Sequence, residues 1–172
     1  MKRYLELFKK VGNLKSTDRE GWKRFGIEDV ESVADHSFRA AFMALVLGDS
    51  FDLDGFKMVK LLLVHDLAES EIGDITPHDH ITEEEKVNKE EEAIKKISGF
   101  DDIELDILEL WKEFETGESQ EAVIARDIDR LERILQAKEY EEKYPKKDLT
   151  EFLIEGGEKL ESEEIKDLLK NF

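Results

Sequence analysis

The stretch Leu61–Pro77, LLLVHDLAESEIGDITP, decides the fold. It begins as an apolar helix, becomes acidic, and ends in the helix breakers Gly73 and Pro77. His65 and Asp66 place an imidazole beside a carboxylate in the middle of this apolar run. Packing alone gives no reason for them, because a buried polar group costs free energy unless it finds a partner. We therefore interpret the rest of the chain as a scaffold that brings further ligands to this pair.

Around this pair the sequence predicts a helix over residues 55–70, which Asp54 can cap. His65 and Glu69 are four residues apart, and Asp66 and Glu69 are three apart, so these side chains are neighbours on a helix surface. Asp74 follows in the loop. One short segment can thus direct an imidazole and two carboxylates into a single cavity.

Hydrophobic periodicity predicts an all-α fold, with one helical bundle of about seven to eight helices in a single domain over residues 1–172. No segment alternates for long enough to be a convincing strand. Ser32, Thr82 and Ser119 are the expected N-caps. The other predicted helices cover residues 3–14, 33–49, 83–98, 102–115, 120–143, 149–160 and 163–171.

Two further segments carry polar residues near apolar stripes. On the helix over residues 33–49, His36 shares its stripe with apolar residues and therefore points inward. A single histidine on such a face is usually a hydrogen-bonded core residue. On the helix over residues 120–143, Asp127 and Asp129 flank Ile128, and helical geometry does not choose between them.

His36, the His65–Asp66 pair and one late aspartate together supply two imidazoles and two carboxylates from three predicted helices. This nitrogen and oxygen set suits Mn²⁺, Fe²⁺, Co²⁺, Ni²⁺ or Zn²⁺. Four protein ligands on an octahedral ion leave positions open for water and a substrate oxygen. The chain has no Cys, so a thiolate site, a disulfide and a Cys nucleophile are excluded.

The composition limits the partners. The net charge of −18 argues against a nucleic-acid polymer, which needs clustered basic residues. The longest apolar stretch, residues 40–47, is far shorter than the ~20 residues of a membrane span. The amphipathic N-terminus does not resemble a signal peptide. We expect a cytoplasmic protein that acts on a small molecule, without a nucleic-acid polymer or a membrane as partner.

A polar loop predicted over residues 16–30 places Trp22 between Arg19 and Arg24. Trp22 either folds back to cap the core or belongs to a ligand site with the two arginines. His78 and His80 form an HxH pair on an acidic loop, and we interpret this pair as solvated rather than metal-binding.

The order of His36, His65–Asp66 and a late Asp resembles the H…HD…D signature of the HD-domain metal-dependent phosphohydrolases. The surrounding sequence is similar to their 5′-deoxynucleotidase (YfbR-like) branch from about Trp22 to Tyr140. The residues that carry this likeness are ESVADH at 31–36, HDLAE at 65–69, GDITP at 73–77, KEEEA at 89–93 and DRLERILQAKEY at 129–140.

The resemblance implies an HD-domain-like helical bundle and a phosphomonoesterase for 5′-deoxynucleoside monophosphates, in which a metal-bound water attacks phosphorus. It implies a divalent ion (Mn, Co, Fe, Ni, Zn or Mg) held by His36, His65, Asp66 and Asp129, since the motif register selects Asp129 over Asp127. Catalytic roles are implied for two more carboxylates. Glu69 would orient the water or accept its proton, and Asp74 would hold a sugar hydroxyl or help to protonate the leaving oxygen.

The family pattern has an arginine where this chain has Gly21, so we expect Arg24 or Arg19 to bind phosphate beside Trp22. We also expect a homodimer, because the resembled family is commonly dimeric and Trp111 and Phe114 offer apolar surface. Three alternatives stay open. They are an HD hydrolase for a cyclic nucleotide, nucleoside triphosphate or sugar phosphate, a non-catalytic nucleotide-binding module, and an acidic helical interaction protein.

Overall fold

The structure is a computed structural model that describes residues 2–76, 79, 81–99 and 106–170. Eight helices of this part have seven residues or more, which confirms the predicted all-α class, and the β-pairing of the described residues is one isolated bridge between Asp18 and Ser32. The elements are α1 (Lys2–Asn13), the 3₁₀ helix η1 (Leu14–Ser16), α2 (Glu20–Lys23), α3 (Val33–Phe51), α4 (Gly55–Val64), α5 (Glu69–Ile72), α6 (Glu83–Ser98), α7 (Ile107–Thr116), α8 (Gln120–Lys143), α9 (Thr150–Glu158) and α10 (Glu163–Leu169).

The predicted N-caps are confirmed. Ser32 and Thr82 each form a capping box, with Asp35 and Glu85 respectively. The side chains of Asp54 and Ser119 accept hydrogen bonds from backbone amides in the first turns of α4 and α8. These contacts satisfy amides that have no partner within the helix, and they fix where each helix begins.

The prediction of one continuous helix over residues 55–70 is wrong. α4 ends at Val64, and a tight turn over residues 65–68 leads into α5. The amides of Leu67, Glu69 and Ser70 donate to carbonyls three residues earlier, at 3.1 to 3.2 Å, which is tighter winding than in an α-helix. The His65–Asp66 pair therefore lies on a turn rather than on a regular helix.

Other boundaries also differ from the prediction. The loop expected over residues 16–30 contains the short helix α2, and α7 begins at Ile107 within the described residues. The prediction for residues 102–105 and the interpretation of His78 and His80 concern residues outside the described part. The part of the chain that the structure describes contains no helix with the length and apolar character needed to cross a membrane.

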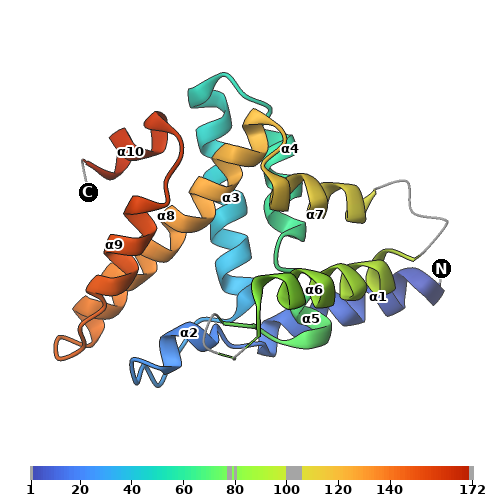
Figure 1. The fold of residues 1–172 in the computed structure, drawn as a ribbon, viewed down its shortest axis with the longest axis horizontal. Helices are drawn as coiled ribbons and strands as arrows, with labels where there is room; N and C mark the ends of the chain where they lie inside the picture. Colours follow the sequence, from blue (N-terminus) through green and yellow to red (C-terminus); the bar gives the residue numbers. More distant parts are fainter. Residues whose placement is uncertain (1, 77–78, 80, 100–105, 171–172) are drawn as a thin grey trace.

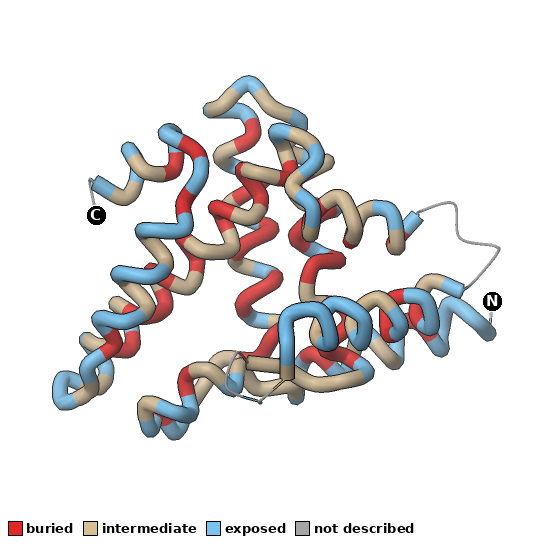
Figure 2. Tube along the Cα trace, viewed as in Figure 1, coloured by how far each residue is buried: buried red, intermediate tan, exposed pale blue. Residues whose placement is uncertain are grey.

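α3, α4 and α8 form the centre of the molecule (Figure 1). α3 and α4 are in close contact at Gly48, where an added Cβ would lie only 2.4 Å from the Cα of Gly55. α9 runs along α8, while α1, α5 and α6 lie below the crossing in Figure 1. Figure 2 shows the buried residues concentrated along α3, α4 and α8, so the core surrounds the segments that carry His36, His65 and Asp129.

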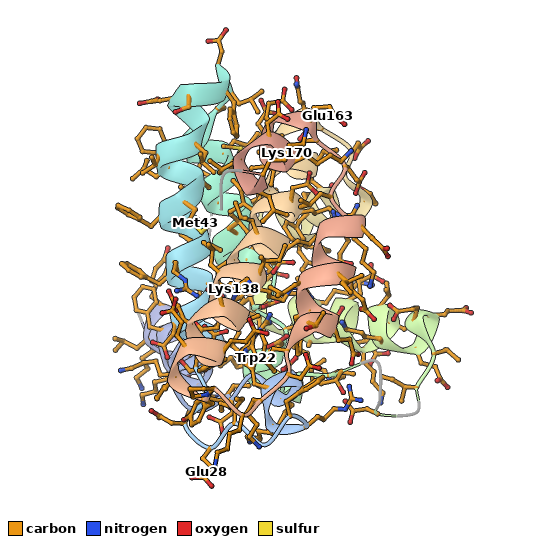
Figure 3. All side chains as sticks on the ribbon, turned by 90° about the vertical axis from the view of Figure 1, so that its left-hand side faces the viewer. Trp22, Glu28, Met43, Lys138, Glu163 and Lys170 are labelled. Atoms are coloured by element: carbon orange, nitrogen blue, oxygen red, sulfur yellow. The ribbon has the colours of Figure 1, made fainter. Side chains whose placement is uncertain are left out.

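Trp111 and Phe114 do not provide the exposed apolar surface that the sequence suggested. They are 2% and 7% exposed, because α7 packs this face against α4, α6 and α8. Exposed apolar side chains lie on several helices instead, α1 and α4 among them. One group of four lies on α3, which forms the left edge of the molecule in Figure 3. We call this group the α3 outer face, and it consists of Phe38, Phe42, Leu45 and Val46.

Candidate metal centre

Four side chains from three parts of the fold converge on one point. His36 comes from α3, His65 and Asp66 from the turn after α4, and Asp129 from α8. His36 Nε2 lies 3.0 Å from Asp129 Oδ1 and 3.3 Å from His65 Nε2, and His65 Nε2 lies 3.1 Å from Asp66 Oδ2. The diagonal distances are 3.8 Å from His36 Nε2 to Asp66 Oδ2 and 3.9 Å from His65 Nε2 to Asp129 Oδ1.

The spacing of these atoms fits one shared cation. Ligand bonds of about 2.1 Å place neighbouring donor atoms roughly 3 to 3.5 Å apart around a tetrahedral or octahedral ion. His65 Nδ1 donates to the carbonyl of Leu62 at 2.8 Å, and His36 Nδ1 is hydrogen-bonded to the Glu132 carboxylate. Both imidazoles are thereby oriented with Nε2 towards the centre. In metal sites, too, the ring nitrogen that does not bind the metal is usually hydrogen-bonded to a carboxylate or a carbonyl.

The charges of the cluster also favour a cation. Burial would raise the pKa of Asp66, but His65 and Arg19 outweigh it and lower that pKa. Burial opposes ionisation of Asp129 too, yet Arg133 and His36 hold its pKa well below the ordinary value. Both carboxylates are therefore ionised at neutral pH. Burial would lower the pKa of His36, but hydrogen bonds with Asp129 and Glu132 raise it to about 9, so without a metal a proton supplies part of the positive charge.

Asp127, the other candidate on α8, lies in a different environment. Its fully buried carboxylate accepts hydrogen bonds from the amide of Ser162 at 2.7 Å, the hydroxyl of Ser162 at 2.6 Å and the amide of Glu161 at 3.0 Å. It also pairs with Arg130 at 2.8 Å. Asp127 thus fixes the start of α10, and the structure brings Asp129, not Asp127, to the cluster.

Glu69 and Asp74 lie beside the four ligand candidates and line the same cavity. Glu69 is 7% exposed, and its Oε2 has no hydrogen-bond partner among the described residues. Burial and the Asp66 charge raise the pKa of Glu69 well above the ordinary value. Asp74 Oδ2 accepts from the amide of Glu20 at 2.6 Å, and burial raises the pKa of Asp74 despite Arg19. Both carboxyl groups are thus largely shielded from solvent beside the ligand candidates.

A cavity of about 440 Å³ opens over the cluster, and its walls include Arg19, Trp22 and Arg24. Arg19 Nη1 donates to Asp66 Oδ2 at 2.9 Å, which places its guanidinium beside the ligand candidates. Trp22 is 2% exposed and packs on Phe152, with ring centroids 4.2 Å apart. It therefore belongs to the core and also forms part of the cavity wall. Figure 3 shows Trp22 between the lower parts of α8 and α9.

Sequence reasoning missed several residues of this site. Arg133 lines the cavity, and its Nη2 lies 3.5 Å from Asp129 Oδ2. Its position four residues after Asp129 is a signal that could have revealed it, because such residues share a helix face. α9 contributes another wall through Phe152 and Glu155, and Lys159 follows directly after the helix. The local pattern of the last thirty residues gave no sign of this, since the contact depends on how α9 packs on α8.

The chain is similar to known proteins over most of its length. A family model described as HD domain matches residues 11–168. The 5′-deoxynucleotidase HDDC2 of Dictyostelium discoideum is 44% identical over 150 residues, which cover 82% of this chain and 79% of that protein. The 5′-deoxynucleotidase HDDC2 of Homo sapiens is 44% identical over 140 residues, which cover 80% of this chain and 68% of that protein.

The fold of the chain is also similar to that of a solved structure. The crystal structure of the PH0347 protein from Pyrococcus horikoshii OT3 matches with a TM-score of 0.83 and 34% sequence identity. The match covers 97% of this chain and 94% of that one.

Proposed function

The chain belongs to the HD domain family, and from this premise we propose that it is a metal-dependent 5′-deoxynucleotidase. It would hydrolyse 5′-deoxynucleoside monophosphates to the deoxynucleoside and phosphate, with residues 1–172 acting as one catalytic domain. The proposal rests on the convergence of two imidazole nitrogens and two carboxylate oxygens. Each nitrogen lies within 3.9 Å of the other nitrogen and of both oxygens.

His36, His65, Asp66 and Asp129 would hold one divalent ion, of which Mn, Co, Fe, Ni, Zn and Mg are the candidates. When bound, the ion would supply Lewis-acid chemistry and lower the pKa of water at its open positions. The protein would contribute the fixed orientation of both imidazoles and the two ionised carboxylates. The cavity above the cluster supplies room for a substrate.

Glu69 would orient the attacking water or accept its proton. Its Oε2 is buried without a hydrogen-bond partner among the described residues, so this oxygen is available for a ligand. A raised pKa suits a group that must take up a proton near neutral pH. Asp74, held by the amide of Glu20, would bind a sugar hydroxyl or help to protonate the leaving oxygen.

The cavity wall provides groups for the rest of a nucleotide. Arg19 and Arg133 flank the cluster, each beside one ligand carboxylate, and a guanidinium matches phosphate oxygens. Arg24 also lines the cavity and could contact a phosphate. Phe152, which packs on the buried Trp22 and lines the cavity, offers an aromatic face for the nucleoside. An added Cβ at Gly21, where the resembled family has arginine, would lie 3.9 Å from Phe152, so space remains there.

We also place the protein in the cytoplasm as a homodimer, supported by its lack of Cys and by the exposed α3 outer face. The proposed function requires neither a nucleic-acid polymer nor a membrane as partner.

The test is phosphate release by the purified protein from dAMP and dUMP with Mn²⁺ or Co²⁺. Ribonucleotides, a nucleoside triphosphate, a cyclic nucleotide and a sugar phosphate complete the panel. The expected result is release from deoxynucleoside monophosphates that a chelator abolishes and that is lost in His65→Ala. Bound metal without release from any deoxynucleotide would remove this substrate class.

A further inference from the structure

A buried carboxylate and a guanidinium stand behind the candidate metal centre, on the side of His36 away from the cavity. We propose that Glu132 and Arg39 form a positioning relay that fixes the orientation of His36 and thereby sets the affinity of the centre for its metal. This inference rests on the proposed function, because it concerns the same metal site. Neither residue is among the described residues that line the cavity, so the relay would act through His36 and not through the substrate.

The first step of the relay is the contact between Glu132 and His36. Both side chains are fully buried, and Glu132 Oε2 is hydrogen-bonded to His36 Nδ1. This contact fixes the ring so that Nε2 faces Asp129, 3.0 Å away. A carboxylate in this place makes the imidazole a stronger ligand as well as a better oriented one.

The second step is the contact between Glu132 and Arg39. An ionised carboxylate in a core is costly unless its oxygens are paired. Arg39 Nε donates to Glu132 Oε1 at 2.7 Å, and Arg39 Nη2 lies 2.6 Å from the same oxygen, which leaves Oε2 for the imidazole. Arg39 thus pairs with one carboxylate oxygen of Glu132 and fixes the position of the carboxylate.

Arg39 is itself held by α8. Its Nη1 lies 2.8 Å from both carboxylate oxygens of Glu139, and its Nη2 donates to Gln136 Oε1 at 2.6 Å. Glu132, Gln136 and Glu139 recur at helical spacing on α8, and His36 and Arg39 lie three residues apart on α3. One planar guanidinium therefore joins the two helices at the level of the ligand, which the point charge of a lysine could not do in the same geometry.

The experiment measures Mn²⁺ binding to the protein by titration calorimetry. Glu132→Gln keeps the shape of the side chain, and Arg39→Met keeps the apolar stem, so both variants are expected to fold. The matched control is Lys57→Met. Lys57 also bridges helices, through Glu113 at 2.7 Å and Glu121 at 3.4 Å, and its exposed fraction is 32% against 30% for Arg39.

We expect Mn²⁺ affinity to fall roughly 10- to 100-fold in Glu132→Gln and about 10-fold in Arg39→Met. Lys57→Met should bind Mn²⁺ like the wild type even where its own melting temperature falls. The double variant Arg39→Met/Glu132→Gln should lose little more than Glu132→Gln alone, because Arg39 acts through Glu132. Arg39→Lys should recover only part of the affinity.

Two results separate failure of the relay from failure of the function. Wild-type affinity in Arg39→Met, or additive losses in the double variant, would overturn the relay and leave the metal site intact. Absence of divalent-metal binding by the wild-type protein would overturn the proposed function and the relay together.

Discussion

Asp127 and Asp129 lie two residues apart on α8, yet their carboxylates have different tasks. Asp129→Asn removes a proposed ligand, so we expect metal affinity to fall by more than the roughly 10- to 100-fold cost of losing an outer partner. Asp127→Asn leaves the cluster unchanged but places an amide NH₂ among the donors at the start of α10. It should lower the free energy of unfolding by about 1–3 kcal/mol.

Metal content after dialysis and urea denaturation measure these two effects separately. The pair of variants is its own control, because each removes one negative charge from the same helix. Retention of metal by Asp129→Asn together with its loss from Asp127→Asn would reverse the assignment.

Glu90 on α6 gives a prediction about pH. Burial, together with Glu115 and Asp66, raises the pKa of Glu90 to about 7, although Lys86 opposes the shift. Between pH 4.5 and 7 the folded protein therefore keeps a proton that the unfolded chain has lost, so this group makes stability fall as pH rises. Glu90→Gln should raise the stability of the metal-free protein at pH 8 by about 1 kcal/mol, or roughly 3 °C.

Thermal melts at pH 5 and pH 8 in the presence of a chelator check this expectation. At pH 5 the variant and the wild type should melt alike. Glu84→Gln, on the exposed face of the same helix, removes an equal charge and serves as control. An equal gain in both variants at pH 8 would show that net charge alone is responsible.

At the scale of elements, the crossing of α3 and α4 depends on Gly48. A Cβ there would lie 2.4 Å from the Cα and 2.8 Å from the N of Gly55, and backbone atoms cannot move aside as a flexible side chain can. Gly48→Ala should lower the free energy of unfolding by about 3 kcal/mol. Activity should fall with it, since α3 carries His36 and α4 leads into His65.

Gly12→Ala on α1 is the matched control, because a Cβ there meets no atom within 4 Å among the described residues. It should be neutral or stabilise by up to about 1 kcal/mol, as alanine favours a helix over glycine. Denaturant unfolding compares the two variants, and equal effects would exclude the close approach as the cause.

The elements also show which features the sequence could predict. Caps such as Ser32 and Thr82 are local, since their partners lie three residues along the chain, and these predictions are confirmed. The turn over residues 65–68 was not predicted, because apolar periodicity continues through it while the hydrogen bonds tighten. The cavity wall on α9 was also missed, because it depends on packing against a distant helix.

For the candidate site, too, some residues could be predicted from the sequence and others could not. The sequence motif identified the four residues that converge, but not the groups that hold them, such as Glu132 and Arg39. Those contacts cross from α3 to α8, 93 and 96 residues apart in sequence, and no local pattern encodes them.

For the whole molecule, the α3 outer face is the surface that we expect to bind a second copy. Phe38 and Phe42 are 73% and 57% exposed in a chain with a net charge of −18. A chain with that charge repels its own copies, so association needs an apolar contact such as this face. Phe42→Glu should convert a dimer into a monomer with unchanged metal content, as light scattering after size-exclusion chromatography would show.

Ile154→Glu, at an exposed apolar position on α9, is the control and should remain dimeric. A wild-type protein that elutes as a monomer at all concentrations would contradict the assignment of this face.

The packing of Trp22 on Phe152 gives the molecule a built-in optical reporter. The chain has two tryptophans, and Trp111 lies in the core while Trp22 forms part of the cavity wall. In a Trp111→Phe background, fluorescence would come from the one indole that a bound nucleoside approaches. Quenching or a spectral shift on adding a deoxynucleotide would then follow occupancy in real time, without a label and independently of turnover.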